Sequence, residues 1–206
     1  MSMIQLLTTD QYRALQREPI ILPPPEALFE YMIETLVAKN LAQYADADPF
    51  RADLPKGLFL LIPPKPEGDI LARIGGRSLV RAADLRDEFA PPAAPYLMID
   101  IDDGCRATGG ALVAEPGRSP FVVWEGVVFA AVFPMVFESH DLVLSGAQAG
   151  GATPTLCLNQ GIPELRAVCY AADGFPGRGV PTCALRVGAP APVSPLTDTS
   201  HCDLLI

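Results

Sequence analysis

Three acidic residues at the end of one apolar run have the types and spacing best suited to chemistry. In the run from Tyr96 to Asp102 (YLMIDID), three aliphatic residues at 97, 99 and 101 alternate with Met98, Asp100 and Asp102, and Asp103-Gly104 follows. Alternation of this kind predicts a β-strand. Asp100 and Asp102 are then expected on one face, with Cα atoms roughly 6.5–7 Å apart. Such a pair can bind Mg²⁺, Mn²⁺ or Ca²⁺ through oxygen ligands, or share a proton and act as acid and base.

The same residues also have a structural interpretation, a half-exposed strand that ends in an Asp-Gly turn. The spacing does not fit an EF-hand loop, which needs acidic ligands at positions 1, 3 and 5 and glycine at position 6. Asp100 and Asp102 are therefore the candidate metal ligands and candidate catalytic residues. A divalent metal is the cofactor that this pair suggests.

Glu125 is the third candidate catalytic residue. It stands among apolar neighbours in an expected helix, beside Trp124 and Val127. An unpaired carboxylate in such surroundings has a raised pKa, which suits a general acid or base facing a pocket. The structural alternative is a first-turn glutamate that caps its own helix or pairs with Arg118.

Other reactive residues form no recognised motif. The two histidines are His140 and His201, and no G-x-S-x-G sequence occurs. Cys183 and His140 would make a nucleophile and base if they met in space, whereas the alternative is a buried strand cysteine. Glu138, His140 and Asp141 either contribute metal ligands or belong to a solvated loop. Residues 146–151 (GAQAGG) lack the Lys-Ser/Thr ending of a phosphate loop and predict a flexible turn.

Composition excludes several classes of protein. The 206 residues carry 15 Lys and Arg against 24 Asp and Glu, a formal charge of −9. An acidic chain lacks the basic footprint that nucleic acid binding needs, and a 50% apolar content excludes disorder. The five cysteines include no C-x-x-C pair, and the N-terminus has no signal peptide pattern, so reduced thiols and a cytoplasmic location are expected.

The elements that would position these residues predict one α+β domain. We expect a mainly antiparallel sheet from about residue 57 onward, packed by two helices at about 26–44 and 120–133. The domain spans 1–206, with a helical segment at 1–50, a core at 57–187 and an extended or flexible tail at 188–206. Apolar residues form one stripe of the first helix, and an acidic stripe lies beside it (Glu26, Glu30, Glu34). That stripe is either a docking face for a basic partner or a solvated face.

Several short motifs occur in a characteristic order between residues 57 and 187. They are Tyr96-Leu97, Asp100-x-Asp102-x-Gly104, Gly117-Arg118-Ser119-Pro120, Glu125-Gly126, Leu144-Ser145-Gly146 and Pro181-Thr182-Cys183-x-x-Arg186. This order resembles an uncharacterised bacterial family of proteins about 200 residues long that carry a domain of unknown function. Val122 stands where that family has a threonine at the start of the helix, so the corresponding capping box is absent. The resemblance implies no catalytic residues.

Two classes of function remain. The first is a soluble, cytosolic, non-catalytic protein that binds a protein partner or a small ligand, with self-association through the 26–44 helix as one form of partnership. The second is a small metal-assisted or acid/base enzyme of hydrolase type that uses Asp100, Asp102 and Glu125. The two differ in burial, because an enzyme needs these carboxylates together in a cleft.

Overall fold

Strands are the most frequent regular elements in the part of the chain that a computed structural model describes, residues 58–93, 96–104, 117–169 and 178–188. The elements in chain order are β1 Leu58–Ile62, the 3₁₀ turn η2 Ala72–Ile74, β2 Arg77–Ser78, the 3₁₀ turn η3 Ala82–Asp84, β3 Leu85–Asp87, β4 Tyr96–Asp102, β5 Ser119–Pro120, α3 Val123–Val132, α4 Val136–Ser139, β6 Asp141–Val143, β7 Ala147–Ala149, β8 Thr153–Asn159, β9 Ile162–Val168, β10 Arg178–Gly179 and β11 Thr182–Gly188.

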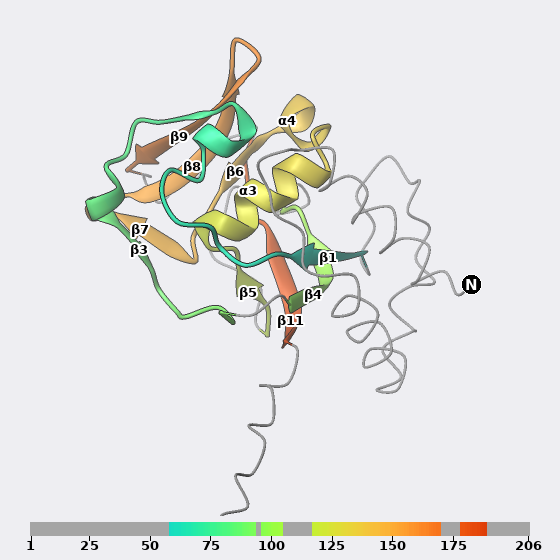
Figure 1. The fold of residues 1–206 in the computed structure, drawn as a ribbon. Coiled ribbons are helices and arrows are strands. Elements are labelled where there is room, and N and C mark those ends of the chain that lie inside the picture. Colours follow the sequence, from blue (N-terminus) through green and yellow to red (C-terminus); the bar gives the residue numbers. More distant parts are fainter. Residues whose placement is uncertain (1–57, 94–95, 105–116, 170–177, 189–206) are drawn as a thin grey trace, which may run out of the picture.

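The strands are divided among three sheets (Figure 1). One sheet has the order β1-β4-β11-β5 and is antiparallel throughout. The second has the order β10-β6-β8-β9-β2. Its two edge strands are parallel to their neighbours, β10 to β6 and β2 to β9. β3 and β7 form a third, two-stranded sheet. The predicted α+β class with mostly antiparallel pairing is thus confirmed, but the expected sheet is split into separate sheets.

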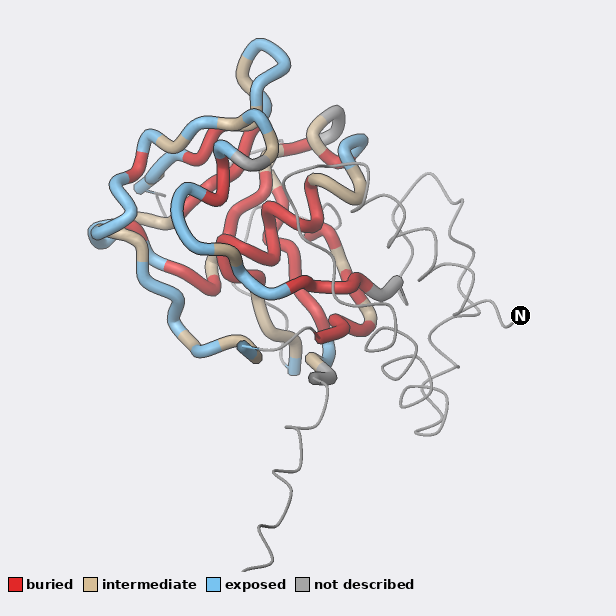
Figure 2. The backbone as a smooth tube through the Cα atoms, in the orientation of Figure 1, coloured by how far each residue is buried: buried red, intermediate tan, exposed pale blue. Residues whose placement is uncertain are grey.

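Helix α3 lies in the interior of the fold and contacts both β1 and β8. Its residues 123–130 are all buried, and this stretch is red along its length in Figure 2. Apart from Glu125, the helix is apolar on all sides, which fits a position in which residues 123–130 do not face water. Gly126 permits the close approach, since a Cβ atom there would overlap the side chain of Leu144. The helix joins the apolar faces of the two larger sheets into one core.

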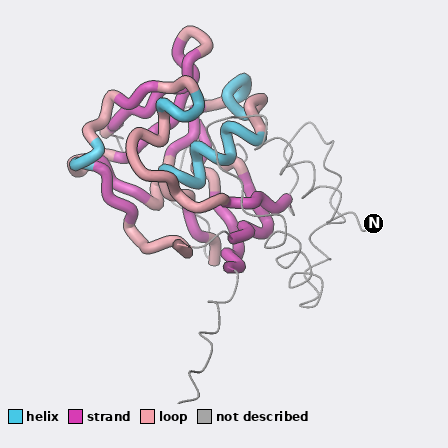
Figure 3. The backbone as a smooth tube through the Cα atoms, viewed as in Figure 1, coloured by secondary structure: helices cyan, strands magenta, loops and turns pink. Residues whose placement is uncertain are grey.

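The helix predicted at about 120–133 is confirmed with narrower limits, Val123–Val132. It starts late because Ser119 and Pro120 pair with β11 as β5, and the Phe121 N–H donates to the Pro181 carbonyl. Pro134 follows its end, as expected from a residue that cannot continue the ladder. Within the described residues, α3 is the one long helix and α4 is a single turn, as Figure 3 shows.

The prediction of two packing helices is therefore not borne out. The expected helix at 26–44, with Glu26, Glu30 and Glu34, lies outside the described residues, as does the tail at 189–206. The described partners of β4 are β1 and β11, and both pair with it in antiparallel fashion.

Candidate functional site

Asp100 lies at an irregularity of β4. The register with β1 shifts between Leu58 and Phe59, and Asp100 is the extra residue, with a positive φ of 53°. Aspartate is one of the few residues other than glycine that adopt this left-handed conformation readily. A bulge changes the direction of side chains locally. The regular strand alternation assumed for Asp100 and Asp102 is therefore interrupted at the first of the two residues.

The Asp100 carboxylate forms an ion pair with Arg118. Arg118 Nη1 donates to Asp100 Oδ2 at 2.8 Å, and both side chains are largely covered, with 11% and 21% of their surface exposed. The same guanidinium donates to the Asp100 carbonyl and to Thr182 Oγ1 at 2.8 Å. Arg118 thus ties the bulge of β4 to the start of β11, and the Asp100 carboxylate already has a cation beside it.

Asp102 closes the turn that follows β4. Its Oδ1 atom accepts the Gly104 N–H at 2.9 Å, and Gly104 has a φ of 77°. This is the Asx type of turn in which a side-chain oxygen binds the backbone two residues on. In the part of the chain that the structure describes, no three His, Cys, Asp or Glu residues lie close enough together to hold a metal ion.

Glu125 is fully buried in the first turn of α3 and accepts four hydrogen bonds. Arg186 binds it in a bidentate manner, from Nε to Oε1 at 2.7 Å and from Nη2 to Oε2 at 2.8 Å. The Tyr96 hydroxyl donates to Oε1 at 2.7 Å, and the Val122 N–H donates to Oε2 at 2.9 Å. Glu125 therefore caps its own helix, as the structural interpretation predicted.

The cation partner of Glu125 differs from the predicted one. Arg118 is bound to Asp100, and Arg186 of β11 takes the place beside Glu125. Arg186 is 12% exposed, lies 4.5 Å from the centre of the Phe89 ring, and donates to the Pro120 carbonyl. The prediction of Arg118 rested on its proximity to Glu125 along the chain, and it was wrong. The actual partner, Arg186, is 61 positions from Glu125 in sequence and lies in β11, which pairs with β4.

The surroundings of this ion pair suppress ionisation of its neighbours. Burial, with the negative charge of Glu125 as a second cause, raises the pKa of the Tyr96 hydroxyl far above its ordinary value. Burial also raises the pKa of the Cys183 thiol to about 11. A thiol with such a pKa is a poor nucleophile near neutral pH, because the thiolate is the reactive form. Cys183 has the features of the buried strand cysteine that was the alternative to catalysis.

Two of the remaining sequence candidates, His140 and Asp141, have structural partners, whereas the Glu138 side chain lies outside the described part of the structure. His140 is buried, and its Nε2 atom lies 3.1 Å from the Asp103 carbonyl oxygen. Asp141 begins β6 and lies 3.8 Å from Arg178 Nε. The glycine-rich segment expected to be a turn is the short strand β7 followed by a turn at Gly150 and Gly151, both with positive φ. His201 lies outside the described residues.

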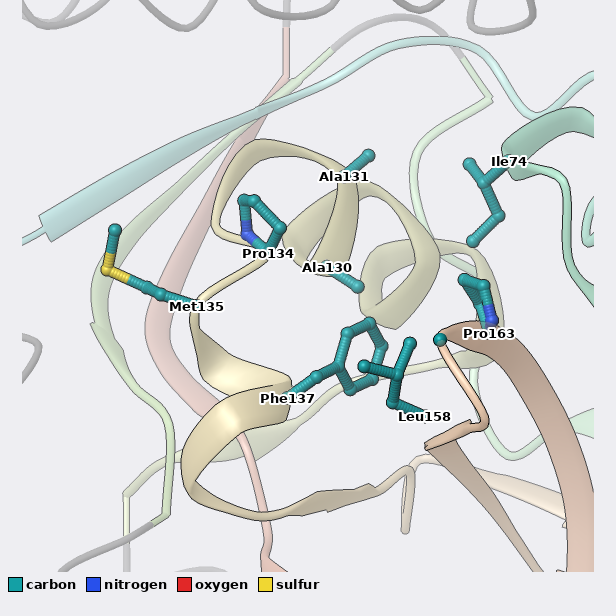
Figure 4. Close-up of a pocket in the computed structure, with 9 residues that line it drawn as sticks. Ile74, Ala130, Ala131, Pro134, Met135, Phe137, Leu158 and Pro163 are labelled. Carbon is teal, nitrogen blue, oxygen red and sulfur yellow. The ribbon is translucent and has the colours of Figure 1, made fainter.

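An apolar hollow at the C-terminal end of α3 was not predicted. It has a volume of about 630 Å³, and Figure 4 shows the side chains around it. The lining residues are Ile74, Ala130, Ala131, Pro134, Met135, Phe137, Leu158, Gly161 and Pro163. None of them is charged. Met135 and Leu158 are large apolar side chains that are 62% and 44% exposed, and Ile162, beside Gly161 in the hairpin turn, is 42% exposed.

Sequence reasoning missed this hollow because four separate elements contribute to it, namely η2, α3, α4 and the β8–β9 hairpin. The adjacent apolar residues Pro134 and Met135 directly after a buried helix were the one local signal. Exposure of apolar side chains is a property of the folded chain, and composition alone does not show it.

Comparisons with protein-family models, curated proteins and solved structures find no match for this chain. Among the described residues, no helix is both long enough and apolar enough to cross a membrane. The resemblance to an uncharacterised bacterial family over residues 57–187 remains a prediction.

Proposed function

We propose that the protein is a non-catalytic binding protein that holds a small, uncharged, apolar ligand in the hollow at the end of α3. The observation that carries the proposal is a hollow of about 630 Å³ lined by nine residues without a charged side chain. Small-molecule sites are typically concave, mostly apolar and of about 300–1,000 Å³. An exposed group of apolar side chains at the rim is a common mark of an interaction site.

The shape of the hollow favours a small molecule over a large surface. Phe137, Leu158 and Pro163 surround it together with the backbone of the β8–β9 turn (Figure 4). An aromatic or branched aliphatic group would replace water against these side chains, at roughly 25 cal/mol for each Å² of apolar surface buried. Charged groups would lose hydration there without a partner among the lining residues.

Binding of the uncharged dye N-phenyl-1-naphthylamine to the full chain tests this proposal. We expect saturable fluorescence enhancement that Leu158→Glu weakens at least about tenfold, because a carboxylate at the rim removes apolar contact and carries its water into the hollow. The matched control is Leu79→Glu, since Leu79 is 63% exposed and does not line the hollow. Equal binding by both variants, or no saturable binding by the unaltered protein, would contradict the proposal.

The enzyme alternative, using Asp100, Asp102 and Glu125 with a divalent metal, has less support. Glu125 is saturated by four donors, Asp100 is held by Arg118, and Asp102 binds the backbone of its own turn. A catalytic carboxylate needs a free oxygen directed at substrate or metal. Titration calorimetry with Mn²⁺ separates the two functions, since saturable binding that Asp102→Asn abolishes would favour the enzyme.

A further inference from the structure

The β8–β9 hairpin has two chemically different faces. The hollow and the core lie on the face of Leu156, Leu158 and Leu165, which packs toward α3. On the opposite face a polar row crosses the whole sheet, because cross-strand neighbours project side chains to the same side. The row runs from β10 to β2 through Arg178, Asp141, Cys157, Glu164 and Arg77.

Glu164 is the anchor of this polar face. Its side chain is 1% exposed, and it accepts hydrogen bonds from Arg77 Nε at 2.5 Å and from Arg166 Nε. These hydrogen bonds, with that from Arg166 the largest cause, lower the pKa of Glu164, so the carboxylate is ionised at neutral pH. The two guanidinium groups belong to neighbouring strands and are held by one carboxylate between them.

Asn159 binds a second nitrogen atom of each of the two guanidinium groups. In the amide orientation that satisfies the hydrogen-bond network, its oxygen accepts Arg77 Nη2 at 3.1 Å and Arg166 Nη2 at 3.2 Å. Each arginine is thereby held at two nitrogen atoms. Rigid placement of this kind reduces the entropy that a ligand must remove when it binds.

The two arginines together have more positive charge and more N–H donors than Glu164 and Asn159 bind. Two guanidinium cations face one carboxylate, and 55% and 45% of the Arg77 and Arg166 side chains remain exposed. Within the described ranges the Nη1 atoms of these two arginines have no acceptor. This local excess of positive charge stands in a chain whose formal charge is −9.

We propose that the Arg77–Arg166 pair is a binding site for an oxyanion, the phosphate or carboxylate group of a small ligand. Guanidinium groups match both oxyanions through paired N–H donors. Glu164 and Asn159 are positioning residues, which orient the arginines from beneath and do not touch the anion. The site lies on the opposite face of the hairpin from the hollow and does not depend on the apolar ligand proposed there.

Titration calorimetry of the full chain with inorganic phosphate and, separately, with acetate tests the site at constant ionic strength. We expect saturable binding of at least one anion, and the stronger of the two identifies the ligand group. Arg166→Gln and Arg77→Gln should each weaken it at least about tenfold. Arg86→Gln, which removes an exposed arginine of β3, should change it less than twofold.

Arg166→Lys distinguishes a fork of donors from simple attraction of charge. It retains the positive charge and keeps a partner for Glu164, so it also serves if Arg166→Gln does not fold. We expect binding weaker than in the unaltered protein, because an ammonium group cannot make the paired contact. Absence of saturable binding of both anions, or equal weakening by Arg86→Gln and the pair variants, would overturn the proposal.

Discussion

Two glutamates are equally hidden from solvent and yet have different surroundings. Glu125 is 0% exposed and Glu164 is 1% exposed. The cation beside Glu125 is also covered, since Arg186 is 12% exposed. The cations beside Glu164 are open, with Arg77 55% and Arg166 45% exposed. Burial of the carboxylate therefore does not distinguish the two sites, whereas exposure of its cations does.

The difference has a chemical consequence. At Glu125 one cation meets one anion, and protein donors occupy both carboxylate oxygens. Such a closed pair contributes positioning and helix capping but presents nothing to a ligand. At Glu164 two cations share one anion, and about half of each arginine side chain is exposed to solvent. The open cluster is the one with capacity for a further anion.

The largest effect we expect is from Glu125→Gln. This change leaves the Arg186 charge buried without a counter-charge, and breaking a buried pair in this way typically costs about 3–5 kcal/mol of unfolding free energy. Urea denaturation measures the loss. The control is Glu88→Gln, which alters an exposed hydrogen bond to Gln148 and should change stability by less than about 0.5 kcal/mol. Equal effects of the two variants would show that the Glu125 pair is not a closed unit.

Alkaline pH tests the closed pair by a second route. Burial raises the pKa of Cys183 to about 11, above the value of about 8.5 for an unfolded thiol. The native state therefore holds a proton that the unfolded chain releases, and this stability is present below about pH 8.5 and is lost as pH rises toward 11. Tyr96, whose pKa is also raised, adds to the loss above its ordinary value of about 10.

The expected slope is a loss of about 1.4 kcal/mol per pH unit for each such group. Denaturation at several pH values between 8 and 11 gives this slope. Cys183→Ala should reduce this slope, and Tyr96→Phe should reduce it above about pH 10. Cys169→Ala, at an exposed cysteine after β9, is the matched control and should leave the slope unchanged. A slope that is the same in all four proteins would contradict the assignment.

Local patterns predicted the elements well but not their partners. The apolar runs around β1, β4 and α3 were visible because strand and helix periodicity are properties of neighbouring residues. The capping role of Glu125 was visible for the same reason, since the cap lies three residues away at Val122. The role of Arg186 as the partner of Glu125 was not visible, because the pairing of β4 with β11 joins residues that no local pattern connects.

The open cluster shows the same limit more strongly. Arg77 and Glu164 are 87 residues apart and meet through a two-residue parallel pairing of β2 with β9. The alternation of polar Thr155, Cys157 and Asn159 with leucines was a local signal of a polar face. It indicates that the face exists, but the identity of the charges that collect on it depends on sheet order. The bulge at Asp100 was hidden too, because its sequence reads as regular alternation.

Of the changes to the two buried glutamates, Glu164→Gln should give the smaller loss of stability. Solvent screens the half-exposed arginines, so their charges remain hydrated when the carboxylate is removed. We expect a loss smaller than that of Glu125→Gln, and confined to pH above the ordinary carboxyl range, because a lowered pKa stabilises the fold only where the unfolded carboxyl is ionised. Urea denaturation at pH 7 and at pH 3 measures the size of this loss and its dependence on pH. A loss at pH 7 as large as that of Glu125→Gln would mean that Glu164 is a closed structural pair, and the distinction drawn from cation exposure would fail.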